Sequence, residues 1–328
     1  MKIRVGVVGC GAHAQTVHIP IFSQSNQFDL IAICDSDHRK LELVGEKYGI
    51  KKRYDDFQKL IGDDEIDAVV IVTPDYLHQP MAMAALEYKK HVLSEKPMAR
   101  NLKEAKELAR FAKKCQTVFA LGLNERFRPE VQEIKRLIEN GDLGRLNYLK
   151  AGWLNNWQDW QMSDWHRSRV AAGAFSSLGV HLLELTLWFL DEDPVSISGW
   201  VHKREDNIED IAIAQLRFPE GLVNIEVGWS LLMEKDFLYC NIFASRGAVL
   251  LNPFKIHRIV RGKMVDATPK LKIRDSYLSS FRIQANFFAN AINKKGEFPF
   301  CWSDGLKIAA ITDAFYSSVA TGREVDLS

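Results

Sequence analysis

The sequence has no long apolar run. Its longest stretches, such as Ala68 to Val72 and Leu182 to Leu190 with Glu184 inside it, are far shorter than the roughly 20 residues that a membrane-spanning helix needs. We therefore expect no transmembrane segment and no membrane partner.

An excess of charge of one sign is also missing. The 43 Lys and Arg residues balance the 42 Asp and Glu residues, which leaves a formal net charge of +1. Nothing global steers such a chain toward nucleic acid or an anionic membrane surface. We predict no nucleic-acid partner, and the simplest partner is a small, roughly neutral molecule.

The cysteines and histidines lack the spacings that indicate metal sites or disulfide frameworks. The sequence has no Cys-x-x-Cys pair and no His-x-x-x-His pair, so we predict no metal site. Gly-x-Ser-x-Gly and Walker sequences are missing too. The odd number of scattered cysteines indicates reduced, mostly buried thiols of a cytoplasmic protein. These cysteines are Cys10, Cys34, Cys115, Cys240 and Cys301.

The first third of the chain alternates short β-rich runs with helical patterns, a βαβ rhythm. The runs are apolar throughout, which suits a parallel sheet with helices on both faces. We therefore predict the α/β class and a doubly wound parallel sheet here. Strands are predicted at 3–8, 30–35, 68–72, 91–94 and 118–121, and helices at 13–25, 37–48, 77–88 and 102–114.

The pattern changes near Gly122. After it, apolar and polar residues alternate in strand-like runs, which is typical of an antiparallel sheet with one solvated or ligand-facing side. We predict two closely packed domains, residues 1–122 and 123–328. The later runs are 197–202, 211–218, 223–230 and 238–244, with hairpin positions at Gly221 and Gly247 and helices at 130–139, 277–293 and 303–321.

A glycine-rich turn follows the first predicted strand and opens a helix, the setting in which a G-x-G-x-x-G/A match predicts dinucleotide binding. The motif is Gly9-Cys10-Gly11-Ala12-His13-Ala14. Gly9 permits the tight turn, Gly11 leaves room for a pyrophosphate, and Ala14 lets the helix approach the sheet. We expect Gly9, Gly11, Ala12 and His13 to contact the cofactor.

An acidic residue ends the next predicted strand. Asp35 fits the carboxylate that hydrogen-bonds an adenosine ribose, and its charge repels a 2′-phosphate, so NAD(H) is favoured over NADP(H). Arg39 and Lys40 lie close enough in sequence to leave NADP(H) open.

Three further motifs carry a family resemblance. They are Thr73-Pro74 with His78, Glu95-Lys96-Pro97, and Gly179-x-His181. With the glycine-rich turn, they make the chain resemble the glucose-fructose oxidoreductase / inositol dehydrogenase / rhizopine-catabolism (Gfo/Idh/MocA) oxidoreductases over essentially its whole length. The resemblance implies a Rossmann domain followed by an α/β domain with a large, mostly antiparallel open sheet. That sheet would carry the substrate site and a homodimer or homotetramer interface.

The resemblance also implies roles for single residues. Lys96 would bind the reacting hydroxyl and help its proton leave, although a lone lysine after a strand is otherwise more often a surface charge. Glu95, Thr73, Pro74 and His78 would lie near the nicotinamide ribose, and for His78 a structural role at the start of a helix is almost equally plausible. Asn124 would approach the cofactor and Arg126 the substrate.

One position departs from the family pattern. Where family members commonly have Asp-x-Gly-x-His, this chain has Ser177 four residues before His181, and we expect both to face the substrate. A hydroxyl offers a neutral hydrogen bond but cannot stabilise a protonated imidazole as a carboxylate does. Three explanations stay open: His181 and Lys96 suffice, the substrate differs, or the protein binds without turnover. His181 could also be a hydrogen-bonded core histidine.

Tryptophans crowd residues 153–165, a stretch that we interpret as a loop. Indole rings stack on sugar faces, so this stretch could form the substrate wall, although Trp and Arg are also enriched in subunit interfaces. We predict that Trp165, His166 and Arg167 bind the substrate, because they lie nearest to the segment with His181.

The function that the sequence predicts is an NAD(P)-dependent oxidoreductase acting on a sugar, polyol or related cyclic compound, with Lys96 and His181 handling the proton. Two alternatives remain: a non-catalytic ligand sensor on the same scaffold, and a redox-assisted elimination or glycoside cleavage.

Overall fold

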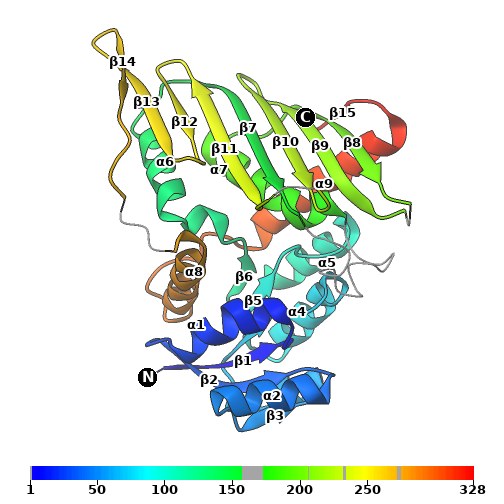
Figure 1. Cartoon of the computed structure of the whole chain (residues 1–328). Coiled ribbons are helices and arrows are strands. Elements are labelled where there is room, and N and C mark those ends of the chain that lie inside the picture. The colour runs from blue at the N-terminus through cyan, green and yellow to red at the C-terminus, as the bar shows by residue number, and fades with distance from the viewer. Residues whose placement is uncertain (1, 157–172, 206, 232–233, 272–274) are drawn as a thin grey trace. The chain divides into compact units, whose positions relative to one another are not determined.

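The computed structural model describes residues 2–156, 173–205, 207–231, 234–271 and 275–328 (Figure 1). The chain forms two compact units. The first comprises Met1–Phe127 and Tyr277–Ala309, and the second comprises Arg128–Ser276 and Ala310–Ser328. The predicted single boundary near Gly122 thus lies five residues from the first change of unit, and the return of 277–309 to the first unit has no counterpart in the prediction.

The first unit contains a six-stranded sheet in which every neighbouring pair is parallel, in the order β3-β2-β1-β4-β5-β6. Its central strands are continuous apolar runs, and all four residues of β4 are buried, as a sheet covered on both faces requires. The predicted doubly wound parallel sheet is confirmed. The strands are β1 Ile3–Val8, β2 Phe28–Cys34, β3 Lys52–Tyr54, β4 Ala68–Ile71, β5 His91–Glu95 and β6 Phe119–Gly122.

Helix α2 of this unit begins and ends at ordinary capping residues. The Asp37 carboxylate accepts backbone hydrogen bonds from Arg39 and Lys40 at the start of α2, which ends at Gly49 with φ +66°. The predicted helix at 13–25 is split into a π-helical turn and a short α-helix. The helical elements are η1 Ala14–His18, α1 Ile19–Ser23, α2 His38–Tyr48, α3 Phe57–Ile61, η2 Asp75–Leu77, α4 His78–Glu87, α5 Leu102–Ala112, η3 Glu125–Phe127 and α8 Ser276–Ile292.

The second unit contains a nine-stranded sheet in the order β14-β13-β12-β11-β7-β10-β9-β8-β15. All neighbouring pairs are antiparallel except β7 with β10. The predicted mostly antiparallel sheet is confirmed, with Gly221 and Gly247 in its hairpins. The strands are β7 Leu146–Leu154, β8 Ser196–Lys203, β9 Glu209–Arg217, β10 Leu222–Gly228, β11 Phe237–Ala244, β12 Gly247–Leu250, β13 Lys255–Val260, β14 Lys263–Asp266 and β15 Val325–Asp326.

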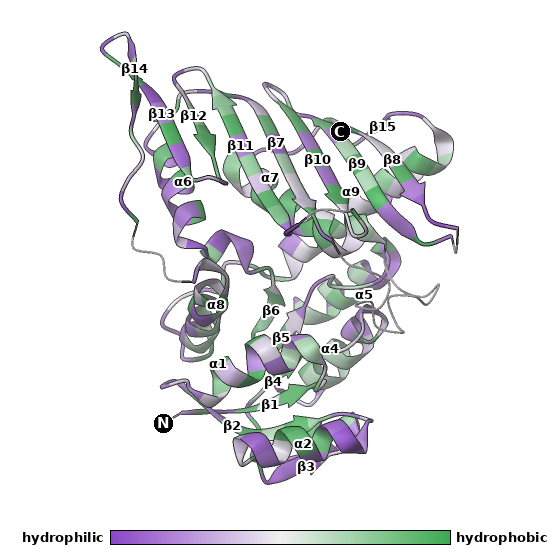
Figure 2. Cartoon of the chain, in the orientation of Figure 1, coloured by the Kyte–Doolittle hydropathy of each residue, from purple (hydrophilic) through white to green (hydrophobic). Residues whose placement is uncertain are grey.

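One face of this sheet is covered by helices and the other displays large side chains. Helix α7 Val180–Leu190 contacts β7 and β10. Figure 2 shows that the strands of this sheet contain both hydrophobic and hydrophilic residues. On the opposite face, strand register places Leu222, Tyr148 and Phe243 side by side, and among the described residues Leu222 is 58% exposed. The other helices with residues in this unit are α6 Pro129–Glu139, the π-helical turn η5 Phe175–Gly179 and α9 Trp302–Thr321, which starts in the first unit.

The five cysteines are free, and Cys10, Cys34 and Cys240 are buried, as expected of reduced thiols. Among the described residues, no helix is both long enough and apolar enough to cross a membrane.

Candidate active site

The glycine-rich turn has the geometry that its sequence predicts. Gly9 has φ +96°, and a Cβ there would lie 2.3 Å from the carbonyl oxygen of Val72, so only glycine fits. A Cβ at Gly11 would meet no protein atom within 4 Å. The turn is therefore closed against the sheet at Gly9 and open at Gly11, where a phosphate group needs room.

The Asp35 carboxylate is fixed against this turn. One oxygen accepts a hydrogen bond from the Cys10 amide at 2.6 Å and the other from the Asp37 amide at 2.8 Å. The carboxylate thus lies at the end of β2 beside the turn, the place where a ribose hydroxyl would meet it in a dinucleotide-binding fold. The residues present fit an NAD-type cofactor.

Glu95, at the end of β5, is buried and accepts hydrogen bonds from two histidines. The Nε2 atoms of His18 and His13 lie 2.8 Å and 3.3 Å from its Oε1 atom. Burial works to raise the pKa of Glu95, but the hydrogen bonds from the two histidines hold it well below its ordinary value. Burial lowers the pKa of His18 despite this contact, so we interpret the pair as a carboxylate that accepts from neutral imidazole.

The donor atoms of His13, His18 and Glu95 all lie within 4.8 Å of one another, a set that could hold a transition-metal ion. Spacing rules miss this set because a π-helical turn brings two histidines five residues apart to a carboxylate from a distant strand. The absence of a metal site stays a prediction.

Lys96 follows Glu95 directly in the sequence, and its side chain is half-buried. The surrounding protein lowers the pKa of its amine by desolvation, while the carboxylates of Glu95, Asp75 and Glu125 act in the opposite direction. Its backbone amide donates to Glu95 Oε2 at 3.2 Å, and the Lys96–Pro97 peptide bond is cis. A lysine in such a place can lose its proton closer to neutral pH than an exposed one.

His78, the first residue of α4, is 2% exposed and lies between two backbone carbonyls. Its Nδ1 atom is 2.8 Å from the carbonyl oxygen of Pro97, and its Nε2 atom is 2.9 Å from that of Thr73. Thr73 donates its hydroxyl to the Met81 sulfur at 3.8 Å, and Pro74 precedes η2. Both ring nitrogens of His78 thus contact backbone rather than face open space.

The predicted Asn124 and Arg126 also have protein partners within the first unit. The side-chain amide of Asn124 donates to Ser280 at 2.9 Å and to Glu125 at 3.1 Å. The Arg126 guanidinium lies 3.3 Å from the Phe300 ring centroid and contacts the Pro299 carbonyl. Their cofactor and substrate roles stay predictions.

His181 and Ser177 belong to the second unit. His181 is 5% exposed near the start of α7, and its ring centroid lies 5.3 Å from that of Trp153. Trp153 lies on strand β7, not in a loop as we interpreted it from the sequence. Ser177 is half-buried in η5. A Cβ at Gly179 would lie 2.6 Å from the Phe175 ring, which explains the glycine of the Gly-x-His motif.

Glu209 is a buried acid that the sequence reading missed. Its Oε1 atom accepts from the Phe175 amide at 2.8 Å, so it caps the segment that carries Ser177 and His181. Burial raises the pKa of Glu209, and the Phe175 and Tyr316 hydrogen bonds offset this only in part. The sequence signal that could have found this acid is a charged residue at the start of the alternating strand β9, Glu209 itself. The predicted substrate residues Trp165, His166 and Arg167 lie outside the described residues.

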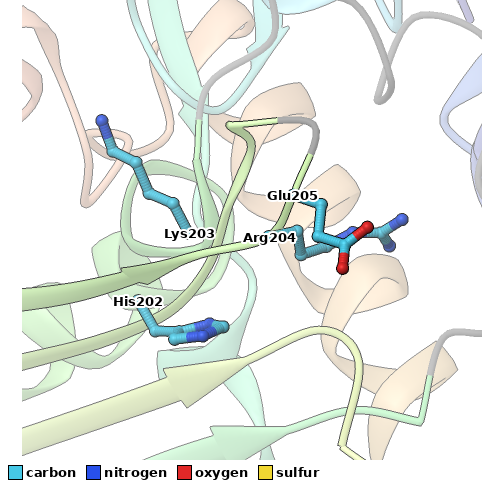
Figure 3. A pocket seen from close by; sticks show the side chains of 4 residues that line it. All are labelled: His202, Lys203, Arg204 and Glu205. Atoms are coloured by element: carbon cyan, nitrogen blue, oxygen red, sulfur yellow. The ribbon is translucent and has the colours of Figure 1, made fainter.

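A separate hollow in the second unit is lined by four consecutive residues, His202, Lys203, Arg204 and Glu205 (Figure 3). The His202 ring contacts the buried Asp210 at 2.7 Å, and Ser230 donates to the other oxygen of that carboxylate. Because the serine bonds to the acid and not to the imidazole, this group is not arranged as a catalytic triad. Of the predicted site residues that the structure describes, none lines this hollow.

Comparisons with known proteins match most of the chain to one family. Residues 3–123 match a family model described as an oxidoreductase family with an NAD-binding Rossmann fold. Residues 131–250 match the Gfo/Idh/MocA C-terminal domain.

Similar proteins span nearly the whole chain. The myo-inositol 2-dehydrogenase of Thermotoga maritima is 25% identical over 94% of this chain and 93% of its own length. The D-glucoside 3-dehydrogenase of Escherichia coli is 24% identical over 99% and 97%. A solved levoglucosan dehydrogenase in complex with NADH and levoglucosan has the same fold, with a TM-score of 0.91 over 100% of both chains at 20% identity. Two models of one family cover most of the sequence, and the chain belongs to the Gfo/Idh/MocA family of NAD-dependent oxidoreductases.

Proposed function

We propose that this protein interconverts a hydroxyl and a carbonyl group on a sugar, polyol or related cyclic compound, with NAD(H) as the redox partner. The observation that carries the proposal is the set of motif residues at one edge of one sheet. Strands β1, β4 and β5 are neighbours, and their carboxyl ends carry the glycine-rich turn, Thr73-Pro74 and Glu95-Lys96. Ligands of open parallel sheets bind at that edge.

The cofactor would be held by the first unit. Gly9, Gly11, Ala12 and His13 would surround the phosphates, and the Asp35 carboxylate would accept from the ribose. Thr73, Pro74, Glu95 and Asn124 would form the nicotinamide end. When bound, the nicotinamide supplies the acceptor or donor of the hydride. Because Asp35 is an anion beside the turn, we expect NAD to bind more tightly than NADP.

The proton would be handled by the chain itself. In the oxidative direction the hydroxyl oxygen gives its proton to the Lys96 amine while its carbon loses hydride, which leaves a carbonyl. Desolvation lowers the pKa of Lys96, so more of the amine is present in the neutral form that accepts a proton. His181 would hydrogen-bond the same oxygen or relay the proton onward. Arg126, Ser177 and the segment with Trp165, His166 and Arg167 would orient the substrate.

The test is NADH formation at 340 nm with a panel of sugars, inositols and glycosides, and NADH consumption with their oxidised forms. Product analysis separates net oxidation from redox-assisted elimination or glycoside cleavage. A flat absorbance across the panel, with NAD shown bound by calorimetry, would contradict the proposal. Gly11→Ala tests the cofactor part: its methyl group meets no protein atom, so folding should persist while NAD affinity falls about tenfold, ~1.4 kcal/mol.

The serine at position 177 favours a second candidate, a non-catalytic sensor of dinucleotide and sugar. A sensor would bind both ligands and show no turnover with any substrate.

We further propose that the sheet face opposite α7, with Leu222, Tyr148 and Phe243 in register, is a contact surface between copies of this chain. Light scattering of wild type and Tyr148→Asp would test it, and an unchanged oligomeric state would count against it.

A further inference from the structure

We propose that His18 and His78 are positioning residues for Lys96, one holding each flank of the Glu95-Lys96-Pro97 turn. The inference deepens the proposed function and rests on it for the importance of Lys96. Its structural content, that two histidines fix the turn, can be tested separately from turnover.

The first flank is held through a side chain. His18 is 2% exposed, and its Nε2 atom donates to Glu95 Oε1 at 2.8 Å. The ring packs against Phe22 and Phe281, with centroids 6.4 Å and 5.5 Å away, so its orientation is set by neighbours on both α1 and α8. The other oxygen of Glu95 accepts the Lys96 amide. His18 therefore fixes the carboxylate that in turn fixes the Lys96 backbone.

The second flank is held through the backbone. His78 Nδ1 contacts the carbonyl of Pro97, the residue after Lys96, while Nε2 contacts the carbonyl of Thr73 at the end of the neighbouring strand. A neutral imidazole has one N–H and donates to one of the two carbonyls, whereas imidazolium donates to both. In the tautomer with its proton on Nδ1, His78 donates to the Pro97 carbonyl and so holds the turn after β5.

Lys96 lies between these two contacts. A lysine side chain is a flexible four-carbon chain, so the position of its amine also depends on how well its backbone is fixed. Misplacement of a reacting group by about 1 Å can cost ~10²-fold in rate. The contacts of His18 and His78 thus supply what a base on a loop needs, and neither requires the histidine to touch cofactor or substrate.

Asparagine and glutamine provide matched variants. The side-chain nitrogen of Asn occupies roughly the place of Nδ1 in histidine, and that of Gln roughly the place of Nε2. His18 acts through Nε2, so His18→Gln keeps the bond and His18→Asn loses it. His78 reaches Pro97 through Nδ1, so His78→Asn keeps that bond and His78→Gln loses it. The two positions therefore require opposite replacements.

The structural readout is amide hydrogen exchange in the peptide that contains Ser94 to Met98. We expect faster exchange in His18→Asn and His78→Gln than in His18→Gln and His78→Asn. His91, at the opposite end of β5, accepts from the Val118 amide and is the control. Its Asn and Gln variants should leave this peptide as in wild type. If both replacements at a position behave alike, the inference is wrong, whether or not the protein turns over.

The kinetic readout follows the same pattern. We expect kcat to fall ~10²-fold in His18→Asn and His78→Gln, which lose the bond. In His18→Gln and His78→Asn, which keep it, kcat should stay within about threefold of wild type. NAD affinity should change less than threefold in all four variants, which separates positioning from cofactor binding. Loss of NAD affinity together with kcat would instead make the histidines cofactor ligands and overturn the inference. If Lys96→Ala keeps full turnover, the proposed function fails while the exchange experiment still decides the role of the histidines.

Discussion

Two buried carboxyl groups, one in each unit, lie beside the two segments proposed to handle the proton. Glu95 precedes Lys96 and accepts from two histidines, whereas Glu209 caps the segment with Ser177 and His181 and contacts a backbone amide and Tyr316. Burial acts to raise the pKa of both acids. It is outweighed at Glu95, whose pKa falls, and prevails at Glu209, whose pKa rises.

The difference shows what a buried acid needs in order to stay ionised. Imidazole N–H donors that point at one oxygen can offset the free-energy cost of desolvating a carboxylate, whereas a single amide and a phenol offset only part of it. The unit with the glycine-rich turn therefore has a fixed negative charge next to its candidate base. The unit with His181 has a carboxyl that is more easily protonated, and a serine where its family commonly has Asp.

Of the effects expected from replacing the two acids, the largest is on turnover. Glu95→Gln removes the charge that raises the pKa of Lys96, so that pKa should fall further. We expect the limb of the kcat/KM pH profile that reports Lys96 to move to lower pH, and kcat to fall ~10²-fold because the turn loses its anchor. Glu209→Gln should leave this limb where it is, as should the exposed control Glu87→Gln. A limb that moves to higher pH in Glu95→Gln would contradict the comparison.

The second effect is on stability at Glu95. A group whose pKa is lower in the folded state contributes stability above its unfolded pKa, and this is lost as pH falls through the folded value. We expect Glu95→Gln to lower the free energy of unfolding by about 2 kcal/mol at pH 7. The gap from wild type should shrink below about pH 4.3, the unfolded value for Glu. Urea unfolding at several pH values measures it, and a gap that is constant with pH would break the account.

The smallest effect has the opposite sign. The pKa of Glu209 is raised in the folded state, so its ionisation costs stability as pH rises from about 4.3 through the folded value. Glu209→Gln keeps an oxygen for the Phe175 amide and removes that cost. We expect its stability to stay within ~1 kcal/mol of wild type and to gain on wild type as pH increases. If both Gln variants follow the same pH trend, the two acids do not differ as described.

Much of the fold could be predicted because each signal was local. Continuous apolar runs predicted the central parallel strands, and alternation predicted four of the nine strands of the second sheet, β8 to β11. Strand β7 was missed because its aromatic and polar residues resemble a loop, and β3 and β15 are too short to produce a pattern. The return of Tyr277–Ala309 to the first unit depends on long-range packing, which no local pattern contains.

The candidate site divides in the same way. The sheet edge that collects Gly9, Thr73 and Lys96 follows from strand order and motif position. The partners of Glu95 do not, because His18 is 77 positions away and reaches it through a π-helical turn. Glu209 could not be predicted as a cap of the η5 segment, because it lies on a strand 34 positions along the chain from Phe175. The contacts that tune a site are thus harder to predict than the residues that form it.

The most direct test of the central claim is turnover by Lys96 variants with the best substrate of the panel. Lys96→Ala removes the amine, and Lys96→Arg keeps the positive charge but cannot lose its proton at neutral pH. We predict that both lose at least ~10³-fold in kcat, within the range of general acid–base catalysis. NAD affinity should stay within about threefold of wild type, and the exposed control Lys114→Ala should be fully active. Turnover in Lys96→Arg close to that of wild type would contradict the claim that Lys96 accepts the proton.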